Sequence, residues 1–157
     1  MPWTPVRPRD PAVLRARPLL DMGTGDGQTL AALVEPTGLV VGVDRRAVLL
    51  RPGSVNARAS ELPFSDAAFG TVLAADLFHH LDDPTLRSVL EEAERVLRPG
   101  GRLVAWWYET STDPSPDAPR YPRRVEEVAR LSQLATEPLD LVTEVPGSPT
   151  VGIVGIR

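Results

Sequence analysis

The sequence predicts an α/β fold, a three-layer sandwich in which helices cover both faces of a mostly parallel sheet. From residue 19 onward, short apolar runs alternate with segments of helical character, which is typical of parallel strands covered on both faces. The first run, Leu19–Met22, leads into Gly23, Gly25 and Gly27, and the second, Leu39–Val43, is followed by Asp44. A strand, a glycine-rich turn, a helix and a second strand ending in a carboxylate form a βαβ nucleoside-binding unit.

The composition excludes several classes of protein. The 157 residues predict a single domain over 1–157, and no apolar run approaches the roughly 20 residues that span a bilayer. Without cysteine there is no disulfide, thiolate nucleophile or sulfur-ligated metal. A formal net charge of -4 gives no general attraction for nucleic acid. The proline-rich start lacks the apolar core of a signal peptide, so we expect a cytoplasmic protein.

The first half of the chain contains the elements of the βαβ unit. Residues 1–18 carry five prolines, which leave room only for a short helix at Ala12–Arg17. A strand at Leu19–Met22, a helix at Gln28–Glu35 and a strand at Leu39–Val43 follow. We then expect a helix of barely two turns at Arg45–Arg51 and a strand at Val55–Ala59.

The second half contains the clearest helix. After a strand at Thr71–Ala75, we expect Asp83 as its N-cap and Pro84 at its first position, with an apolar face that ends before Pro99-Gly100-Gly101. A strand at Leu103–Tyr108, a proline-rich linker over 110–122 and a helix at about Pro122–Ala135 come next. The last two strands, Leu139–Val145 and Val151–Ile156, have a short connection and should be antiparallel neighbours or near-neighbours.

The glycine spacing indicates which kind of nucleoside is bound. Nicotinamide and flavin sites have G-x-G-x-x-G, which would require glycine at the position of Gln28, whereas this chain has G-x-G-x-G. The spacing therefore argues against a dinucleotide. Asp44 stands at the end of the second strand, where a carboxylate can accept hydrogen bonds from both ribose hydroxyls.

Two further segments carry a family resemblance. Glu61-Leu62-Pro63-Phe64 with Asp66 and Phe69, and Arg95-Val96-Leu97-Arg98-Pro99-Gly100-Gly101, stand in order after the glycine loop and Asp44. Over residues 19–109 the chain resembles the class I S-adenosylmethionine-dependent methyltransferases, in particular the small-molecule group. The resemblance implies a Rossmann-like, seven-stranded sheet of order 3-2-1-4-5-7-6 with an antiparallel last strand, and S-adenosylmethionine as the cofactor.

The same resemblance implies a set of site residues. The methionine moiety would lie against the glycine loop and Asp21. The ribose would bind to Asp44. The adenine would lie between the loop after the third strand and apolar neighbours such as Leu62. The segment after the fourth strand, which includes Leu77, would lie beside the sulfonium and the acceptor. The cofactor-binding residues are then Asp21, Gly23, Gly25, Gly27, Asp44, Ala59, Ser60, Leu62 and Asp76.

Methyl transfer from a sulfonium is an in-line displacement on an activated donor, so alignment and exclusion of water supply most of the acceleration. A base is useful where the acceptor is a hydroxyl or a protonated amine, and imidazole suits that role near neutral pH. His79 and His80 are the only histidines and hence the candidate catalytic bases. One of the aromatic residues 106–108 that points outward could line the acceptor pocket.

Three departures from the family pattern qualify this interpretation. Only 18 proline-rich residues precede Leu19, so we expect the N-terminal lid helices to be largely absent, with the acceptor pocket completed by residues 1–18, a second copy or a macromolecular partner. Asp44 and Leu62 are 18 residues apart, where a full helix and strand need roughly 30. Arg58 stands where relatives often carry an acidic residue that accepts from the adenine amino group, and a guanidinium accepts nothing.

The predicted function is transfer of a methyl group to a small-molecule acceptor, without nucleic acid or membrane as partner. Because of the departures, a second hypothesis stays open, namely a methyltransferase-like domain that binds S-adenosyl ligands without catalysis or acts as an interaction module. A third, a nucleotide-dependent oxidoreductase, is disfavoured by the glycine spacing and the closing pair of strands.

Overall fold

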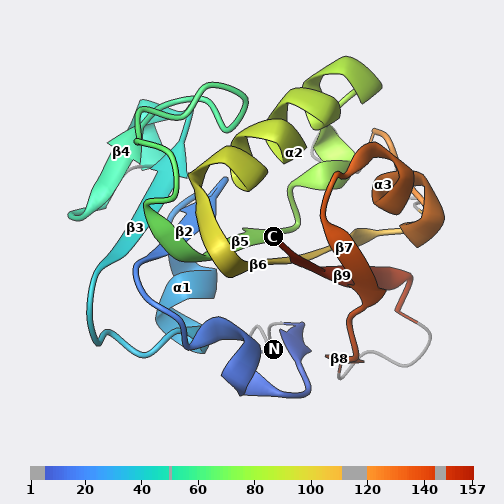
Figure 1. Ribbon diagram of the computed structural model, residues 1–157, viewed down its shortest axis with the longest axis horizontal. Helices are drawn as coiled ribbons and strands as arrows, with labels where there is room; N and C mark the ends of the chain where they lie inside the picture. Colours follow the sequence, from blue (N-terminus) through green and yellow to red (C-terminus); the bar gives the residue numbers. More distant parts are fainter. Residues whose placement is uncertain (1–5, 50, 111–119, 144–147) are drawn as a thin grey trace.

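A computed structural model describes residues 6–49, 51–110, 120–143 and 148–157 (Figure 1). Within these ranges a seven-stranded sheet has the order β4-β3-β2-β5-β6-β9-β7. Its first five strands are mutually parallel, and β9 is antiparallel to both of its neighbours. This confirms the expected order 3-2-1-4-5-7-6 with an antiparallel last strand. The strands are β2 (Leu19–Met22), β3 (Val40–Asp44), β4 (Ser54–Asn56), β5 (Phe69–Ala75), β6 (Leu97–Tyr108), β7 (Ala135–Pro138) and β9 (Thr150–Ile156).

Helices cover the two faces of this sheet, with α2 and α3 on one side and α1 and η1 on the other (Figure 1). The helical elements are η1 (Pro11–Leu14), α1 (Gln28–Leu33), η2 (Ala47–Leu49), η3 (Phe78–His80), α2 (Asp83–Val96) and α3 (Val125–Leu131). Two hydrophobic cores result, a larger one with α2 and α3 and a smaller one with η1 and α1. Successive residues of β6 alternate between them, since Trp106 lies in the smaller core and Trp107 in the larger.

Helix α2 begins one residue earlier than its sequence pattern indicated. The N-cap is Asp82, whose carboxylate accepts a hydrogen bond from the Thr85 N–H at 2.9 Å, and Asp83 is already helical. At its other end the helix passes directly into β6 at Leu97, so Pro99-Gly100-Gly101 lie within the strand. Gly100 has a φ of +78°, a conformation that glycine adopts without strain. The strand therefore starts six residues before the expected Leu103.

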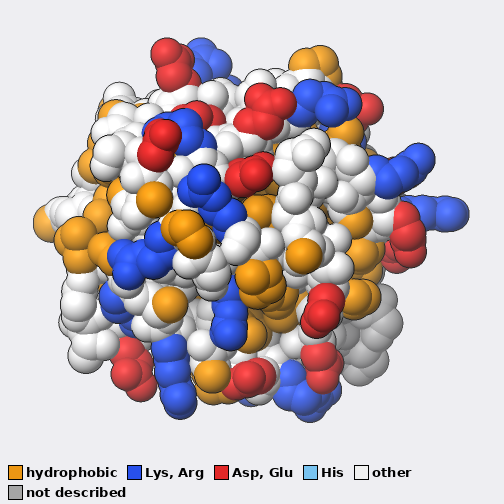
Figure 2. Space-filling model, in the orientation of Figure 1, with side chains coloured by type: hydrophobic (Ala, Val, Ile, Leu, Met, Phe, Trp, Pro, Cys, Tyr) orange, Lys and Arg blue, Asp and Glu red, His pale blue; other side chains and the backbone are white. Residues whose placement is uncertain are grey.

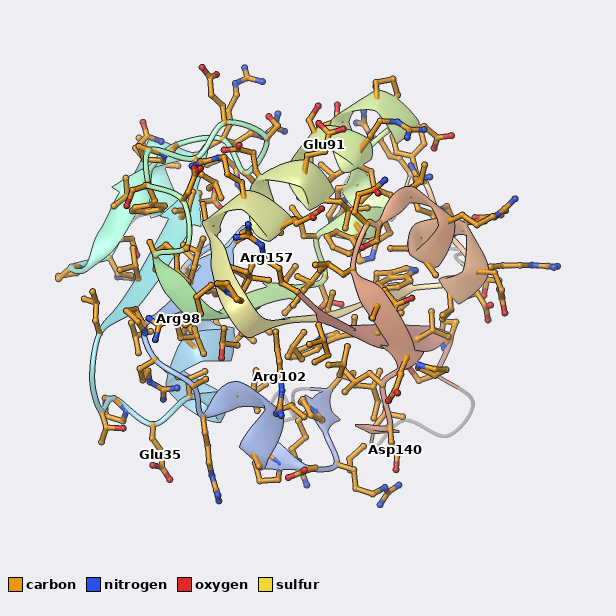
Figure 3. All side chains as sticks on the ribbon, viewed as in Figure 1. Glu35, Glu91, Arg98, Arg102, Asp140 and Arg157 are labelled. Carbon is orange, nitrogen blue, oxygen red and sulfur yellow. The ribbon has the colours of Figure 1, made fainter. Side chains whose placement is uncertain are left out.

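The largest correction concerns the strand expected at Leu139–Val145. The sheet edge is instead β7, Ala135–Pro138, whose side chains are mostly exposed and give no apolar run to detect. Leu141–Val142 form β8, which pairs with β1 (Arg7–Pro8) in a separate two-stranded sheet. Beside this pairing, the Arg9 N–H donates to the Asp140 carbonyl at 2.9 Å, and the exposed Arg9 guanidinium lies 2.7 Å from the Asp140 carboxylate. Figure 3 labels Asp140 at this edge. Residues 144 and 145 of the expected strand lie outside the described residues.

Several shorter elements differ from their expected lengths. Helix α3 is confined to Val125–Leu131, and α1 ends two residues before Glu35. The helix expected at Arg45–Arg51 is a single 3₁₀ turn, η2, and that expected at Ala12–Arg17 is the 3₁₀ turn η1. Strand β4 ends at Asn56, three residues before Ala59. Most of the expected linker over 110–122 lies outside the described residues.

The two segments that carry the family resemblance are joined by hydrogen bonds around Arg95. Its guanidinium donates to the carbonyl of Phe64 at 2.7 Å and to that of Leu62 at 3.1 Å. Glu92, one turn earlier in α2, binds Arg95 and accepts from the Leu62 N–H at 2.6 Å. Charge-assisted bonds of this kind are stronger than neutral ones. They fix the segment between β4 and β5 against α2.

The C-terminal arginine closes the same end of α2. The Arg157 guanidinium donates to the carbonyls of Arg95 and Leu97, where helix passes into strand (Figure 3). On the face shown in Figure 2, arginines and carboxylates are interspersed and form no continuous basic area. That surface is mixed in charge, as the small net charge of the chain indicates.

Candidate functional site

A cavity of about 770 Å³ opens at the carboxyl ends of the parallel strands. Ligands of open α/β sheets bind at this edge, because the loops that leave the strands diverge there. The wall comes from the loops after β2, β3, β4 and β5, from the start of α2 and from the segment before α3. The lining residues are Gly23, Val43, Asp44, Arg45, Arg46, Ala57, Arg58, Ala59, Ser60, Asp76, Leu77, His80, Leu81, Asp82, Thr85, Val89, Arg120 and Tyr121.

In the loop after β2, all three expected glycines adopt a backbone conformation that favours glycine. Gly23, Gly25 and Gly27 have φ values of +72°, +57° and +81°, in the left-handed region that disfavours a side chain. A Cβ on Gly23 would also lie 3.0 Å from the Leu77 side chain. The G-x-G-x-G spacing therefore reflects a backbone that turns sharply at the cavity edge.

Asp44 at the end of β3 holds this loop in place. Its buried carboxylate accepts from the Gly25 N–H at 3.0 Å through Oδ2, and from the Arg46 N–H at 2.8 Å through Oδ1. The Arg46 Nε also approaches Oδ1, at 3.3 Å. A carboxylate offers about four lone-pair sites, so one site on Oδ2 is left for a further donor. The residue expected to bind ribose is thus also a structural tether between two loops.

Asp21 lies behind the glycine loop, at the third position of β2. Its side chain is almost fully buried, and within the described residues neither its Oδ2 nor the Thr24 Oγ1 beside it has a hydrogen-bond partner. Burial raises the pKa of Asp21 to about 7, with an opposing effect of the Thr24 hydroxyl and a smaller rise from the Asp44 carboxylate. A buried carboxyl oxygen without a partner is costly, although Asp21 does not itself line the cavity.

Asp76 begins the loop after β5 in a strained conformation. Its φ is +54°, uncommon for a residue with a side chain, and its N–H donates to the Trp106 carbonyl at 2.9 Å. The carboxyl stands in the concave wall, where water reaches it but the surrounding protein raises its pKa to about 6. Strain of this kind is found at functional sites more often than elsewhere.

The two histidines lie in different environments. His80 lines the cavity, whereas His79 is buried behind the wall, and burial, with the neighbouring His80, lowers the pKa of His79 to about 3. The His79 Nδ1 accepts from the Tyr108 N–H at 3.0 Å, and its Nε2 is 3.1 Å from the His80 Nε2. His79 therefore does not line this cavity in the structure, whereas the sequence placed it beside the acceptor.

Comparisons with known proteins indicate the family of this chain. The family model described as a methyltransferase domain matches residues 20–105, which contain the glycine loop, Asp44 and both histidines. The chain belongs to this family.

Individual relatives of this methyltransferase domain agree with the family match. It is 37% identical over 100 residues to an uncharacterized methyltransferase of Mycobacterium tuberculosis, covering 59% of this chain and 40% of that protein. It is 33% identical over 125 residues to a demethylmenaquinone methyltransferase of Clavibacter sepedonicus, covering 73% and 49%. The chain thus spans between two fifths and half of the length of these relatives.

Solved structures show the same fold. The YcgJ protein of Bacillus subtilis matches with a TM-score of 0.70 at 18% identity, covering 88% of this chain and 91% of that one. A 1,6-didemethyltoxoflavin-N1-methyltransferase of Burkholderia thailandensis, crystallised with 1,6-didemethyltoxoflavin and S-adenosylhomocysteine, matches with a TM-score of 0.66 at 20% identity, covering 88% and 70%. At these identities the likeness concerns the fold.

Several expected site residues of the methyltransferase domain lie elsewhere. Of the nine expected cofactor-binding residues, five line the cavity, namely Gly23, Asp44, Ala59, Ser60 and Asp76. Asp21, Gly25, Gly27 and Leu62 do not, and Leu62 is buried in the larger core. Trp106 and Trp107 are both buried, and neither lines the cavity. Residues 6–18 do not line it either, so within this range the proline-rich segment does not complete the pocket.

Several residues of the cavity wall were not predicted from the sequence. Arg45, Arg46 and Arg120 line the cavity, and so does Tyr121, whose N–H donates to the His79 carbonyl at 2.8 Å. Arg45 and Arg46 could have been inferred from their position directly after the second strand. Arg120 and Tyr121 follow a proline-rich stretch with no periodic pattern, so no local signal identified them.

Among the described residues, no helix combines the length and apolar character needed to cross a membrane. The same part of the chain holds no cluster of three histidine or carboxylate side chains placed to bind a metal ion.

Proposed function

We propose that this methyltransferase domain binds S-adenosylmethionine in the cavity and transfers its methyl group to a small-molecule acceptor. The observation that carries the proposal is the Asp44 carboxylate, which accepts from the Gly25 N–H of the glycine loop at 3.0 Å and lines the cavity. In nucleoside-binding sites a carboxylate of this kind accepts hydrogen bonds from the ribose hydroxyls, and the neighbouring glycine-rich loop lets the ligand approach the backbone closely. The family match and the names of the relatives support the methyl donor.

The residues around the cavity fit this donor in three places. Asp21 does not itself line the cavity, but its Oδ2, buried and without a partner in the described residues, lies directly before the glycine loop and would accept from the amino group of a methionine moiety next to Gly23. The ribose would lie on Asp44, and Ala59 and Ser60 would line the adenine.

When bound, S-adenosylmethionine supplies a methyl group on a positively charged sulfur, which is already activated for displacement. The chain's own contribution is then to align the acceptor, to exclude water and to hold charges near the sulfonium. Asp76, in its strained loop on the cavity wall, is the carboxylate placed to do the last of these. No step requires a side chain to form a covalent bond.

The acceptor belongs to the class of small molecules that a cavity can enclose beside the donor. The volume of about 770 Å³ lies within the range of small-molecule sites, roughly 300–1,000 Å³. Relatives act on acceptors such as a demethylmenaquinone, to judge from the name of the Clavibacter sepedonicus protein. For this chain we propose the class and not the compound.

Isothermal titration calorimetry tests the proposal directly. The chain is titrated with S-adenosylmethionine, with S-adenosylhomocysteine and, as a control, with NAD. We expect saturable binding of the first two and none of NAD. Formation of S-adenosylhomocysteine with a panel of small hydroxyl, amine and carbon acceptors then tests transfer. Absence of heat with both S-adenosyl ligands would refute the proposal.

A further inference from the structure

Residues 120–124, directly before α3, form one side of the cavity and are tied to neighbouring elements. The Tyr121 N–H donates to the His79 carbonyl in η3 at 2.8 Å. The Trp107 Nε1–H, near the end of β6, donates to the Arg123 carbonyl, also at 2.8 Å. The segment therefore has a defined place beside the carboxyl ends of β5 and β6, and the structure shows which side chains it brings to the cavity.

Arg123 joins this segment to the start of α2. Its guanidinium is almost fully buried and donates to the Asp83 carboxylate and to the Leu81 carbonyl. It also lies 5.8 Å from the centre of the Tyr121 ring, within the range of a cation–π contact. Leu81 and Tyr121 both line the cavity, so Arg123 holds two parts of its wall from behind.

The wall carries arginines that have no partner of opposite charge. Among the described residues, Arg46 pairs with Asp44, whereas the other cavity-lining arginines form no ion pair and no side-chain hydrogen bond. These are Arg45, Arg58 and Arg120. A guanidinium is always protonated and offers five N–H donors in a planar fork, which suits an anionic oxygen group.

The unpaired arginines lie at two ends of the cavity. Arg45 and Arg58 follow β3 and β4, whereas Arg120 is tied through Tyr121 to η3, which follows β5. In the sheet β2 separates β3 from β5, and neighbouring strands lie about 4.8 Å apart. In the proposed function the ribose lies on Asp44 after β3 and the methionine moiety on the loop after β2. The space left for the acceptor is then on the β5 side, with Arg120.

The rest of this end is apolar or already engaged. Its apolar surface comes from Leu77, Leu81 and Val89. The Asp82 carboxylate caps α2 by accepting from the Thr85 N–H at 2.9 Å. Asp76 is assigned to the sulfonium in the proposed function. Arg120 is thus left as the charged group of this end that an acceptor can pair with.

We propose that Arg120 binds an anionic oxygen group of the methyl acceptor, so that the substrates of this cavity are small molecules with an apolar body and a group such as a carboxylate. This inference rests on the proposed function and narrows its substrate class. The apolar body would contact the leucines of the wall, while the guanidinium donates two parallel hydrogen bonds to the anion. A neutral molecule of the same shape binds more weakly.

The test compares two probes of similar shape and different charge, 2-naphthoate and 2-naphthamide. Each is titrated into the ¹⁵N-labelled chain, alone and with saturating S-adenosylhomocysteine, and backbone amide shifts report the Kd and the place of binding. We expect naphthoate to bind about fivefold more tightly, which corresponds to a strong exposed ion pair. The Tyr121 amide should be among the signals that shift. Equal affinity for the two probes, or no saturable binding of naphthoate, would overturn the proposal.

Variants at exposed arginines assign the preference to one residue. Arg120→Gln should abolish it, and Arg120→Lys, which keeps the charge without the planar fork, should retain part of it. The matched control is Arg102→Gln, because Arg102 is exposed, pairs with Thr71 near the start of β5 and does not line the cavity (Figure 3). A preference that persists in Arg120→Gln, or that is lost in Arg58→Gln instead, would overturn the proposal.

The same titrations keep this inference apart from the proposed function. Weaker S-adenosylhomocysteine binding by Arg120→Gln, with an unchanged preference for naphthoate, would assign Arg120 to the donor's own carboxylate and overturn the inference. Binding of S-adenosylhomocysteine without any preference between the probes would refute the inference alone. A preference that depends on Arg120 in a chain that binds no S-adenosyl ligand would refute the proposed function alone.

Discussion

Replacing Asp44 by alanine should lower both the stability of the chain and its affinity for S-adenosylmethionine, by amounts that the geometry allows to be worked out. The carboxylate accepts from the Gly25 and Arg46 backbone N–H groups at 3.0 and 2.8 Å, and its side chain is buried. Each bond to a charged acceptor is worth about 1.5–3 kcal/mol. The Arg46 guanidinium is well exposed, so its ion pair adds little.

Taking the lower value for both backbone bonds, Asp44→Ala costs about 3 kcal/mol of folding free energy. In a domain of this size that corresponds to a fall in Tm of roughly 6–12 °C. Asp44→Asn is the matched control, because its amide oxygen keeps one of the two acceptors and should cost about half as much. Thermal unfolding followed by circular dichroism measures both variants.

Ligand affinity is measured on the same variants well below their unfolding temperatures. Loss of the remaining acceptor on Oδ2 should weaken S-adenosylmethionine binding by about tenfold or more in Asp44→Ala, since about 1.4 kcal/mol corresponds to a factor of ten. An unchanged Tm in Asp44→Ala would refute the tethering of the glycine loop. An unchanged affinity with the expected fall in Tm would refute the assignment of Asp44 to the ribose.

Three further predictions concern charged groups around the site. Because burial raises the pKa of Asp21 to about 7 from 3.8, the folded chain keeps a proton that the unfolded chain releases above about pH 4. Stability should therefore fall as pH rises from 4 to 7. Asp21→Asn should reduce this fall, leaving the part up to about pH 6 that comes from Asp76, whose pKa is also raised, and should weaken S-adenosylmethionine binding; a pH dependence in urea unfolding equal to that of the unchanged chain would contradict it. Arg58→Asp adds an acceptor at the cavity wall, so calorimetry should show up to about tenfold tighter S-adenosylmethionine binding, and weaker binding would show that Arg58 supports the site. Arg95→Lys removes guanidinium bonds to two carbonyls and should cost about 1–3 kcal/mol, with faster hydrogen exchange confined to residues 62–66; uniform exchange along the chain would speak against a local clamp.

The sheet topology could be predicted from the sequence because its central strands are buried. Apart from Asp21 and Thr71, the residues of Leu19–Met22 and Thr71–Ala75 are apolar, as is typical of strands between two helical layers. The edge strand Ala135–Pro138 was missed because it joins the sheet through its backbone and exposes most of its side chains. The neighbouring segment 139–142 was mistaken for it, although its Leu139 and Leu141 pack against the smaller core.

The residues of the site also fall into two groups, those that the sequence predicts and those that it does not. Gly23, Gly25 and Asp44 could be predicted because backbone conformation and a strand-end carboxylate leave a local signal. The different environments of His79 and His80 could not, since adjacency in sequence does not reveal which ring a 3₁₀ turn directs inward. Arg120 was missed for a related reason, because it reaches the wall from a segment far along the chain. Contacts between distant segments need the folded structure.

The neighbouring tryptophans of β6 have a practical consequence. Because Trp106 and Trp107 point to opposite faces of the sheet, one side chain reports on the layer of α1 and the other on the layer of α2 and α3. Replacing either one by phenylalanine, together with Trp3, leaves a single tryptophan in a chosen layer of the sandwich. Two such proteins form a pair of built-in optical probes. Coincident denaturation curves would identify a cooperative unit, and separate curves would show which layer opens first.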